Sequence, residues 1–175
     1  VLNQIVYDEV RVPATLRVGE EDRGWALLKA TVGHERILNA DVGRARAMLD
    51  RLAGVARQEL RDGRPLIEHH GFRQRMARAE SRLRALEALV LRVIATPDPA
   101  NGPDAPLIKI RGTELQQDLS WLLSEAAGPY GLPYHREVLT DGWTGAPIGP
   151  PDAAMLTPFY LFWRKASISA GTNEI

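Results

Sequence analysis

The sequence predicts an all-α fold, an antiparallel up-and-down bundle of the four-helix type, and three observations support this prediction. Apolar residues recur at steps of three and four along several long segments. Stretches rich in glycine and proline separate these segments. The chain has 175 residues, of which 45% are hydrophobic and 25% charged, and this suits one globular domain with a single core.

Residues 1–20 differ from the rest and are expected to be the tail of a β-domain with its linker. The stretch "NQIVYDEVRVP" alternates in polarity and is rich in β-branched residues, which predicts a short strand before the bundle. A strand this short needs a sheet with which to pair. Residues 21–175 are then expected to form the helical domain, with its final helix missing.

The helices are expected in order along this second part. The first runs from about Asp22 to Arg61, with an apolar stripe of Trp25, Leu28, Val32, Val42, Ala45, Leu49, Leu52 and Ala56. The second carries Phe72, Met76, Ala79, Leu83, Leu86, Val90 and Val93 on the same period. The third buries Ile108, Leu115, Leu119 and Leu122. After an aromatic stretch rich in glycine and proline, the last helix is expected from about Asp152 to Ser169.

Composition excludes several functional classes. Lysine plus arginine equals aspartate plus glutamate, 22 against 22, so no net charge attracts nucleic acid or an anionic membrane. The absence of cysteine excludes disulfides, thiolate metal sites and a cysteine nucleophile, and no other metal site is expected. No apolar run approaches the ~20 residues of a membrane span, and no signal peptide opens the chain. We therefore expect a cytoplasmic domain.

Two polar residues interrupt the apolar stripe of the first helix. Glu35 and Asn39 lie one turn apart and are expected to face the core. A buried carboxylate is costly unless it gains a partner or a raised pKa. Two interpretations remain open: an ion pair with Arg36 or with an arginine on another helix, or a general base in an apolar pocket. Ion pairs of this kind are the more common of the two.

The last residues, "SISAGTNEI", indicate a turn that leads into another helix. Gly171 suits a positive φ, because it has no Cβ. Thr172 or Asn173 is then expected to cap a helix whose first turn includes Glu174.

Two stretches give the chain a family resemblance that covers essentially all of its length. "NQIVYDEVRVPATLRVGEEDRGWALLKATVGHERI" is similar to the passage by which acyl-CoA dehydrogenases leave their β-domain and enter a long helix with Glu-Arg. "SISAGTNEI" resembles the loop before the final helix of that family. The middle of the chain, including "GPYGLPY", is most similar to actinobacterial members, some of which act on steroid side-chain thioesters as mixed-subunit tetramers.

The resemblance implies an FAD-dependent α,β-dehydrogenation of an acyl-CoA thioester, as in fatty acid or steroid side-chain β-oxidation. An electron-transfer flavoprotein or a similar acceptor would take up the electrons, and the enzyme would be a homo- or hetero-oligomer, dimeric or tetrameric. Many members carry the catalytic glutamate directly before Gly-Thr, where this chain has Ala170. Other branches place it in the Glu-Arg of the long helix, and there this chain has Glu35. The resemblance thus implies Glu35 as the base that removes the α-proton.

Further residues match substrate and cofactor positions of the family. Gly33 and Arg36 match positions on the substrate side of the site. The backbone N–H of Ala170, followed by Gly171, matches the donor that stabilises the developing enolate. The family pair that approaches FAD corresponds here to Thr172 and Glu174.

Two other cofactor segments depart from the family pattern. Glu59 and Asp62 stand where Arg and Phe are usual, ahead of Gly63, and His70 stands where glutamine is common. Further along, a degraded Gln-x-x-Gly-Gly-x-Gly leaves Glu125, Gly128, Pro129 and Gly131 in the matching places, so Gly128 and Gly131 are the remaining cofactor candidates. Pyrophosphate is better bound by arginine and backbone N–H groups than by carboxylates. A second role therefore stays open, that of a non-catalytic partner subunit in a mixed oligomer.

Overall fold

The computed structural model describes residues 3–97, 102, 104–146, 149–150, 153–169 and 171–174, and for residues 30, 33, 34 and 36 it describes the backbone alone. This part of the chain forms five α-helices: α1 (Gly24–Leu38), α2 (Val42–Gln58), α3 (His70–Ile94), α4 (Asp104–Ala126) and α5 (Ala153–Trp163). A hairpin of β1 (Leu60–Arg61) and β2 (Arg64–Pro65) joins α2 to α3. Short 3₁₀ helices cover Ala14–Leu16, Leu66–Glu68, Gly128–Gly131, Arg136–Leu139 and Arg164–Ser167. None of the described helices has the length and apolar character that crossing a membrane requires.

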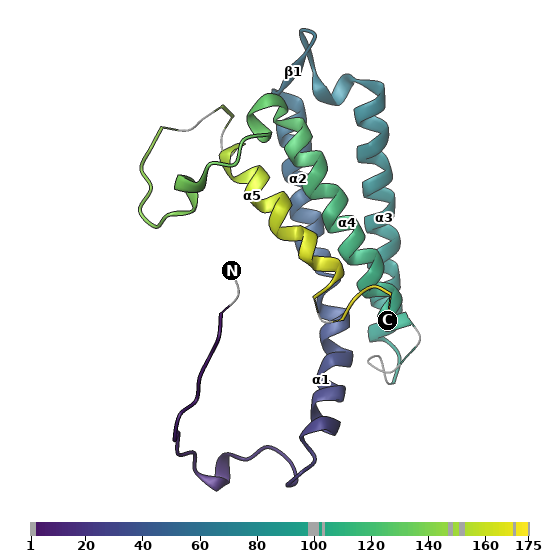
Figure 1. Ribbon diagram of the computed structural model, residues 1–175. Coiled ribbons are helices and arrows are strands. Elements are labelled where there is room, and N and C mark those ends of the chain that lie inside the picture. The colour runs from purple at the N-terminus through teal and green to yellow at the C-terminus, as the bar shows by residue number, and fades with distance from the viewer. Residues whose placement is uncertain are drawn as a thin grey trace.

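The helices are arranged as an antiparallel bundle, which confirms the predicted all-α class. In Figure 1, α2 and α4 run in one direction while α3 and α5 run in the other, and α1 projects beyond one end of the bundle. α4 is the central element, because it packs against α1, α2, α3 and α5. The C-terminal loop, whose described residues are 167–169 and 171–174, returns to the end of the bundle from which α1 projects (Figure 1).

The core consists of the apolar faces of α2, α3 and α4. The predicted positions that are buried are Ala45, Leu49, Leu52, Ala56, Phe72, Ala79, Leu83, Leu86, Val93, Ile108, Leu115, Leu119 and Leu122. Met76 and Val90 lie at the edge of this core and are partly buried. Helical periodicity thus identified the faces that the bundle buries.

The single helix predicted from Asp22 to Arg61 is wrong, because the chain breaks between α1 and α2. Asp41 has a positive φ of 40°, and its carboxylate accepts a hydrogen bond from the N–H of Arg44 as the N-cap of α2. The apolar period continues across the break, so the sequence pattern does not show it.

Close contact with α4 stabilises this break. Gln116 Nε2 donates to the carbonyls of Asn39 and Ala40 at 3.1 and 3.0 Å. A Cβ on Gly112 would lie only 2.5 Å from the Cα of Ala40, which is completely buried. Only glycine at position 112 allows α4 to approach the chain this closely.

The strand predicted before the bundle is also wrong, since residues 3–13 contain no strand and are exposed. No other described segment pairs with them, and a strand needs a neighbour to satisfy its backbone groups. The burial predicted for Trp25 and Leu28 on α1 is also wrong, since their side chains are 68% and 50% exposed. The last helix is shorter than expected, with α5 ending at Trp163 before a 3₁₀ turn.

Candidate functional site

A row of polar side chains on one face of α4 holds the C-terminal loop. Lys109, Thr113 and Gln117 follow one another at steps of four, so they lie on the same side of the helix. Lys109 and Thr113 are only 4% and 2% exposed. Buried polar groups need hydrogen-bond partners, and all three find them between Arg164 and Asn173.

Among the described residues of this loop, Lys109 contacts oxygen atoms of Ser167, Gly171 and Asn173. Its Nζ donates to the side-chain Oδ1 of Asn173 at 2.9 Å, to the carbonyl of Ser167 at 3.4 Å, and to the carbonyl of Gly171. A lysine ammonium offers three donors and no acceptor, so this set of oxygens suits it.

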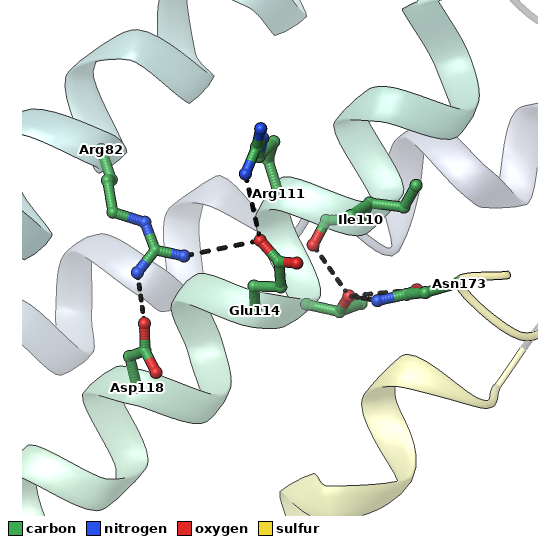
Figure 2. Close-up of polar contacts among 7 residues, drawn as sticks. Arg82, Ile110, Arg111, Glu114, Asp118 and Asn173 are labelled. Carbon is green, nitrogen blue, oxygen red and sulfur yellow. Dashed lines mark hydrogen bonds and ion pairs between the residues drawn. The ribbon is translucent and has the colours of Figure 1, made fainter.

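Asn173 points from the loop toward α4 (Figure 2). Its Nδ2 donates to Thr113 Oγ1 at 3.3 Å, and the Thr113 hydroxyl donates to the carbonyl of Ile110 at 3.1 Å. The N–H of Asn173 donates to the carbonyl of Ser167 at 2.9 Å and closes the loop. No helix follows among the described residues, so the expected cap, Thr172 or Asn173, stays a prediction, and the structure shows Asn173 engaged with α4.

The residues on either side of Asn173 have more exposed side chains. Gly171 has a positive φ of 93°, as predicted. Thr172 is half-buried, and its Oγ1 accepts from the N–H of Glu174 at 3.4 Å. The Thr172 hydroxyl, aided by the backbone N–H of Glu174 and the charge of Lys109, holds the pKa of the exposed Glu174 carboxyl below its usual value. Ala170 lies outside the described residues.

Gln117 and Arg164 fix the turn that precedes this loop. Gln117 Nε2 donates to the carbonyl of Arg164 at 3.3 Å and to Ser167 Oγ at 3.2 Å. Arg164 Nη2 donates in return to the carbonyl of Gln117 at 2.9 Å and to Ser120 Oγ at 3.1 Å. The sequence analysis missed these anchors. Their signal was the polar series at positions 109, 113, 117, 120 and 124 inside an otherwise apolar helix.

Glu35 lies on the last turns of α1, and the expectation that it faces the core is wrong. Its side chain is exposed, and no hydrogen bond or ion pair joins its carboxylate to another described side chain. Asn39, one turn later, is half-buried, and its Nδ2 has no partner among the described residues. Gly33 and Arg36 lie on the same helix, but the side chain of Arg36 is outside the description.

One stretch of α4 connects the end of α1 to the C-terminal loop. Lys109 and Thr113 bind the loop, while Gly112 and Gln116 contact the backbone that follows α1. The helical period explains this division, because residues one step apart point to different sides of a helix. The turn that carries Glu35 and the loop that begins after residue 170 are therefore anchored to the same two turns of α4.

The opposite side of the same turns carries ion pairs. Figure 2 shows Arg82 of α3 between Glu114 and Asp118, with Arg111 beside Glu114. These side chains are partly exposed, so the pairs contribute little to stability, about 0–1 kcal/mol each. They link α3 to α4 and leave the loop-binding face to uncharged groups and Lys109.

Near the end of α4, the residues that match the degraded cofactor motif take part in the fold. Both oxygens of Glu125 accept hydrogen bonds from Arg75, at 2.6 and 2.5 Å. Gly131 is buried, and its carbonyl accepts from Ser124 Oγ at 2.8 Å and from Thr157 Oγ1. Gly128 is half-buried and has a positive φ of 57° at the end of α4, which gives it a role in the turn. Gly128 and Gly131 therefore each have a structural role, and their expected contact with a cofactor stays a prediction.

The region around Asp62 is a tight hairpin turn. Asp62 and Gly63 both have positive φ values, 52° and 73°, as a two-residue turn between twisted strands requires. Glu59 precedes the hairpin as the C-cap of α2, and Asp62 is exposed. Two carboxylates around such a turn do not suit a pyrophosphate.

Comparison with known proteins gives one consistent family. The family model described as acyl-CoA dehydrogenase, C-terminal domain, matches residues 22–175. Acyl-CoA dehydrogenase FadE29 of Mycobacterium tuberculosis is 30% identical over 131 residues, which are 75% of this chain and 34% of that protein.

Two solved structures share the fold and are at least 25% identical to this chain in sequence. The Tcur3481–Tcur3483 steroid ACAD is 28% identical with a TM-score of 0.69, and the match covers 96% of this chain and 41% of that one. The ChsE4–ChsE5 complex of Mycobacterium tuberculosis is 25% identical with a TM-score of 0.68 and the same coverage. The chain thus spans about a third to two fifths of the length of these relatives. It belongs to the acyl-CoA dehydrogenase family, whose C-terminal helical domain it forms.

Proposed function

We propose that this chain is the C-terminal domain of an FAD-dependent acyl-CoA dehydrogenase, and that Glu35 removes the α-proton of the acyl thioester. The observation that carries the proposal is the joint anchoring of the Glu35 turn and the Gly171 loop on two turns of α4. The family places its base at one or the other of these positions. Because residue 170 is alanine, Glu35 is the carboxylate that remains for this role.

The exposure of Glu35 fits a base that meets its substrate outside the bundle. A carboxylate without a partner among the described side chains is available to accept a proton. Trp25, Leu28 and Leu38 on the same helix are also exposed, so α1 presents apolar surface together with a carboxylate. Covering this surface would exclude water from the carboxylate of Glu35.

The backbone around residue 170 would bind the thioester carbonyl. Its N–H would stabilise the enolate that develops as Glu35 removes the α-proton. This contact needs no particular side chain, so alanine is compatible with it. Gly33 and Arg36 would line the substrate side next to Glu35. A bound FAD would accept the β-hydrogen as hydride, and from this chain it would meet Thr172 and Glu174.

A second candidate is a non-catalytic partner subunit in a mixed acyl-CoA dehydrogenase oligomer. It is favoured by the state of the cofactor segments, where Glu125 is bound by Arg75 and Gly131 by Ser124 and Thr157. The ChsE4–ChsE5 relative is a complex of two different chains, and the Tcur relative is named as a steroid enzyme.

For either candidate, we propose that the chain works in a hetero-oligomer. We propose a steroid-like or other bulky acyl-CoA as the substrate and an electron-transfer flavoprotein as the electron acceptor.

The two candidates are separated by one substitution in the full-length protein, purified alone and with its genomic neighbour. Glu35→Gln keeps the shape of the side chain but cannot accept a proton, so turnover per flavin should fall by about 10²–10⁴-fold. The melting temperature should hardly change, because Glu35 is exposed. Glu68→Gln, at another exposed glutamate, is the matched control and should alter neither property.

The other outcomes each have a clear meaning. If Glu35→Gln leaves turnover unchanged in a flavin-loaded preparation, Glu35 is not the base and the partner-subunit role is favoured. If Glu35→Gln lowers the melting temperature and leaves turnover per folded site intact, the carboxylate has a structural role. Adding Ala170→Glu to the Glu35→Gln protein should restore part of the turnover if the loop follows the path of the family.

A further inference from the structure

We propose that Lys109 is the positioning residue of the C-terminal loop, and that its charge holds Ser167, Gly171 and Asn173 of this loop in place. The inference rests on the proposed function for what the loop does in turnover. The anchoring itself rests on contacts between described residues.

Burial is the first argument. Lys109 is 4% exposed, and removing an ammonium group from water is costly unless strong partners replace the water. The other two lysines of the chain, Lys29 and Lys165, are exposed and lie over the rings of Trp25 and Phe162 at 5.6 and 3.8 Å. Lys109 is thus the one lysine that the fold buries, and the C-terminal loop supplies acceptors for its ammonium group.

The second argument is the position of these contacts along the loop. The carbonyls of Ser167 and Gly171, which Lys109 contacts, lie on either side of residue 170. The Ser167 carbonyl also accepts the N–H of Asn173, so it is the point where the loop closes on itself. Lys109 therefore binds the loop on both sides of residue 170, at the carbonyls of Ser167 and Gly171.

The third argument is the difference between charged and neutral anchors. Hydrogen bonds from an ammonium group are about twice as strong as neutral ones. Thr113 and Gln117 add neutral bonds to Asn173 and Ser167, at 3.3 and 3.2 Å. We expect Lys109 to dominate the restraint and Thr113 to make a smaller contribution to it.

The test compares Lys109→Met with Lys29→Met in the full-length protein. Methionine keeps the length of the stem and removes the charge. Hydrogen exchange of the amides of residues 168–174 should rise by about 10- to 100-fold, the change expected when charged hydrogen bonds are lost. Exchange in α3 should stay the same, and Lys29→Met should change neither region.

The same Lys109→Met variant should also change the kinetics. Its kcat should fall by about 10-fold or more, whereas its KM should change far less, because the restraint acts on the donor to the developing enolate.

A second variant covers the case in which Lys109→Met does not fold. Thr113→Val removes the partner of Asn173 Nδ2 with little change of shape, and it should raise exchange in the same loop by about 3- to 10-fold. Loop exchange that is unchanged in the folded variants would overturn the proposal, and so would a loosened loop with kcat intact. If the loop loosens but the unmodified protein does not dehydrogenate any acyl-CoA, the anchoring stands and the proposed function fails. If the unmodified protein is active and loop exchange does not respond, the anchoring fails alone.

Discussion

α1 and α4 contact each other, yet they have opposite environments. α4 is buried around most of its surface, and five of its polar or charged residues are buried as well: Lys109, Thr113, Gln116, Ser120 and Ser124. α1 has no buried residue among its described side chains, and it exposes Trp25, Leu28 and Leu38. Both helices have amphipathic or apolar sequences, so the difference comes from the number of neighbours that each one meets.

The comparison shows that buried polar residues mark the element that organises the site. Each of the polar side chains of α4 named above donates to a backbone carbonyl of a neighbouring segment or of its own helix. Such groups are costly to bury, and their bonds specify where loops attach. α1 instead presents a carboxylate and apolar surface, which suits contact with a substrate or with another protein surface.

The largest expected difference between the two helices concerns their leucines. Leu115→Ala, at a completely buried position of α4, should lower the free energy of unfolding of the 175-residue chain by about 2–5 kcal/mol, because it leaves a cavity. Leu28→Ala, half-exposed on α1, should lower it by less than about 1 kcal/mol. Urea unfolding measures both values. Equal losses would contradict the contrast between the helices.

A glycine pair tests the close approach of α4 to the break after α1. Gly112→Ala would place a Cβ 2.5 Å from the backbone of Ala40, and overpacking of this kind costs about 1–3 kcal/mol. Gly54→Ala on α2 meets no atom within 4 Å and should instead stabilise the chain by about 0.5–1 kcal/mol. Thermal unfolding of both variants checks the opposite signs. If Gly112→Ala is neutral, the approach is looser than described.

The break itself depends on Asp41, the N-cap of α2 at a positive φ. Asp41→Ala removes the capping carboxylate and leaves alanine in a left-handed conformation that its side chain cannot stabilise. The free energy of unfolding should fall by about 1–2 kcal/mol. Asp41→Gly loses the cap but relieves the conformational strain, and a smaller cost of a few tenths of a kcal/mol is expected. Chemical unfolding ranks the two. The reverse order would show that the left-handed conformation is not retained.

The smallest expected effect concerns the carboxyl group of Glu174, whose pKa is lowered mainly by the Thr172 hydroxyl. A carboxyl with a lowered pKa stabilises the folded state above its ordinary pKa, and this contribution is lost as the pH falls through the folded-state value. An NMR titration should give a midpoint below that of an ordinary glutamate. In Thr172→Val the midpoint should move back up, and an unchanged midpoint would exclude the hydroxyl as the main cause.

The sequence was sufficient to predict the bundle and most of its core, because residues such as Phe72, Leu83 and Leu119 follow the helical period. It was also sufficient to predict the positive φ of Gly171, since few other residues tolerate it. Helical periodicity and a positive φ are local properties, so the sequence pattern alone predicts them.

What the sequence did not reveal depends on contacts between distant segments. The break at Asp41 is stabilised by Gln116, 76 residues from Ala40 to which it donates, and the apolar period gives no sign of it. The burial of Lys109 depends on a loop 62 residues away. Glu35 is exposed because no element among the described residues covers its face of α1. Apolar periodicity shows which face of a helix is apolar, but it does not show whether another element covers that face.

The most direct test of the central claim is exchange of the α-proton of a bound acyl-CoA in D₂O. Flavin-loaded full-length protein without an electron acceptor should incorporate deuterium at the α-carbon, because a general base removes and returns this proton. Glu35→Gln should lower the rate of incorporation by about 10²-fold or more, while Glu68→Gln leaves it unchanged. Mass spectrometry of the recovered thioester measures the rate. Undiminished exchange in Glu35→Gln would contradict the assignment of Glu35 as the base.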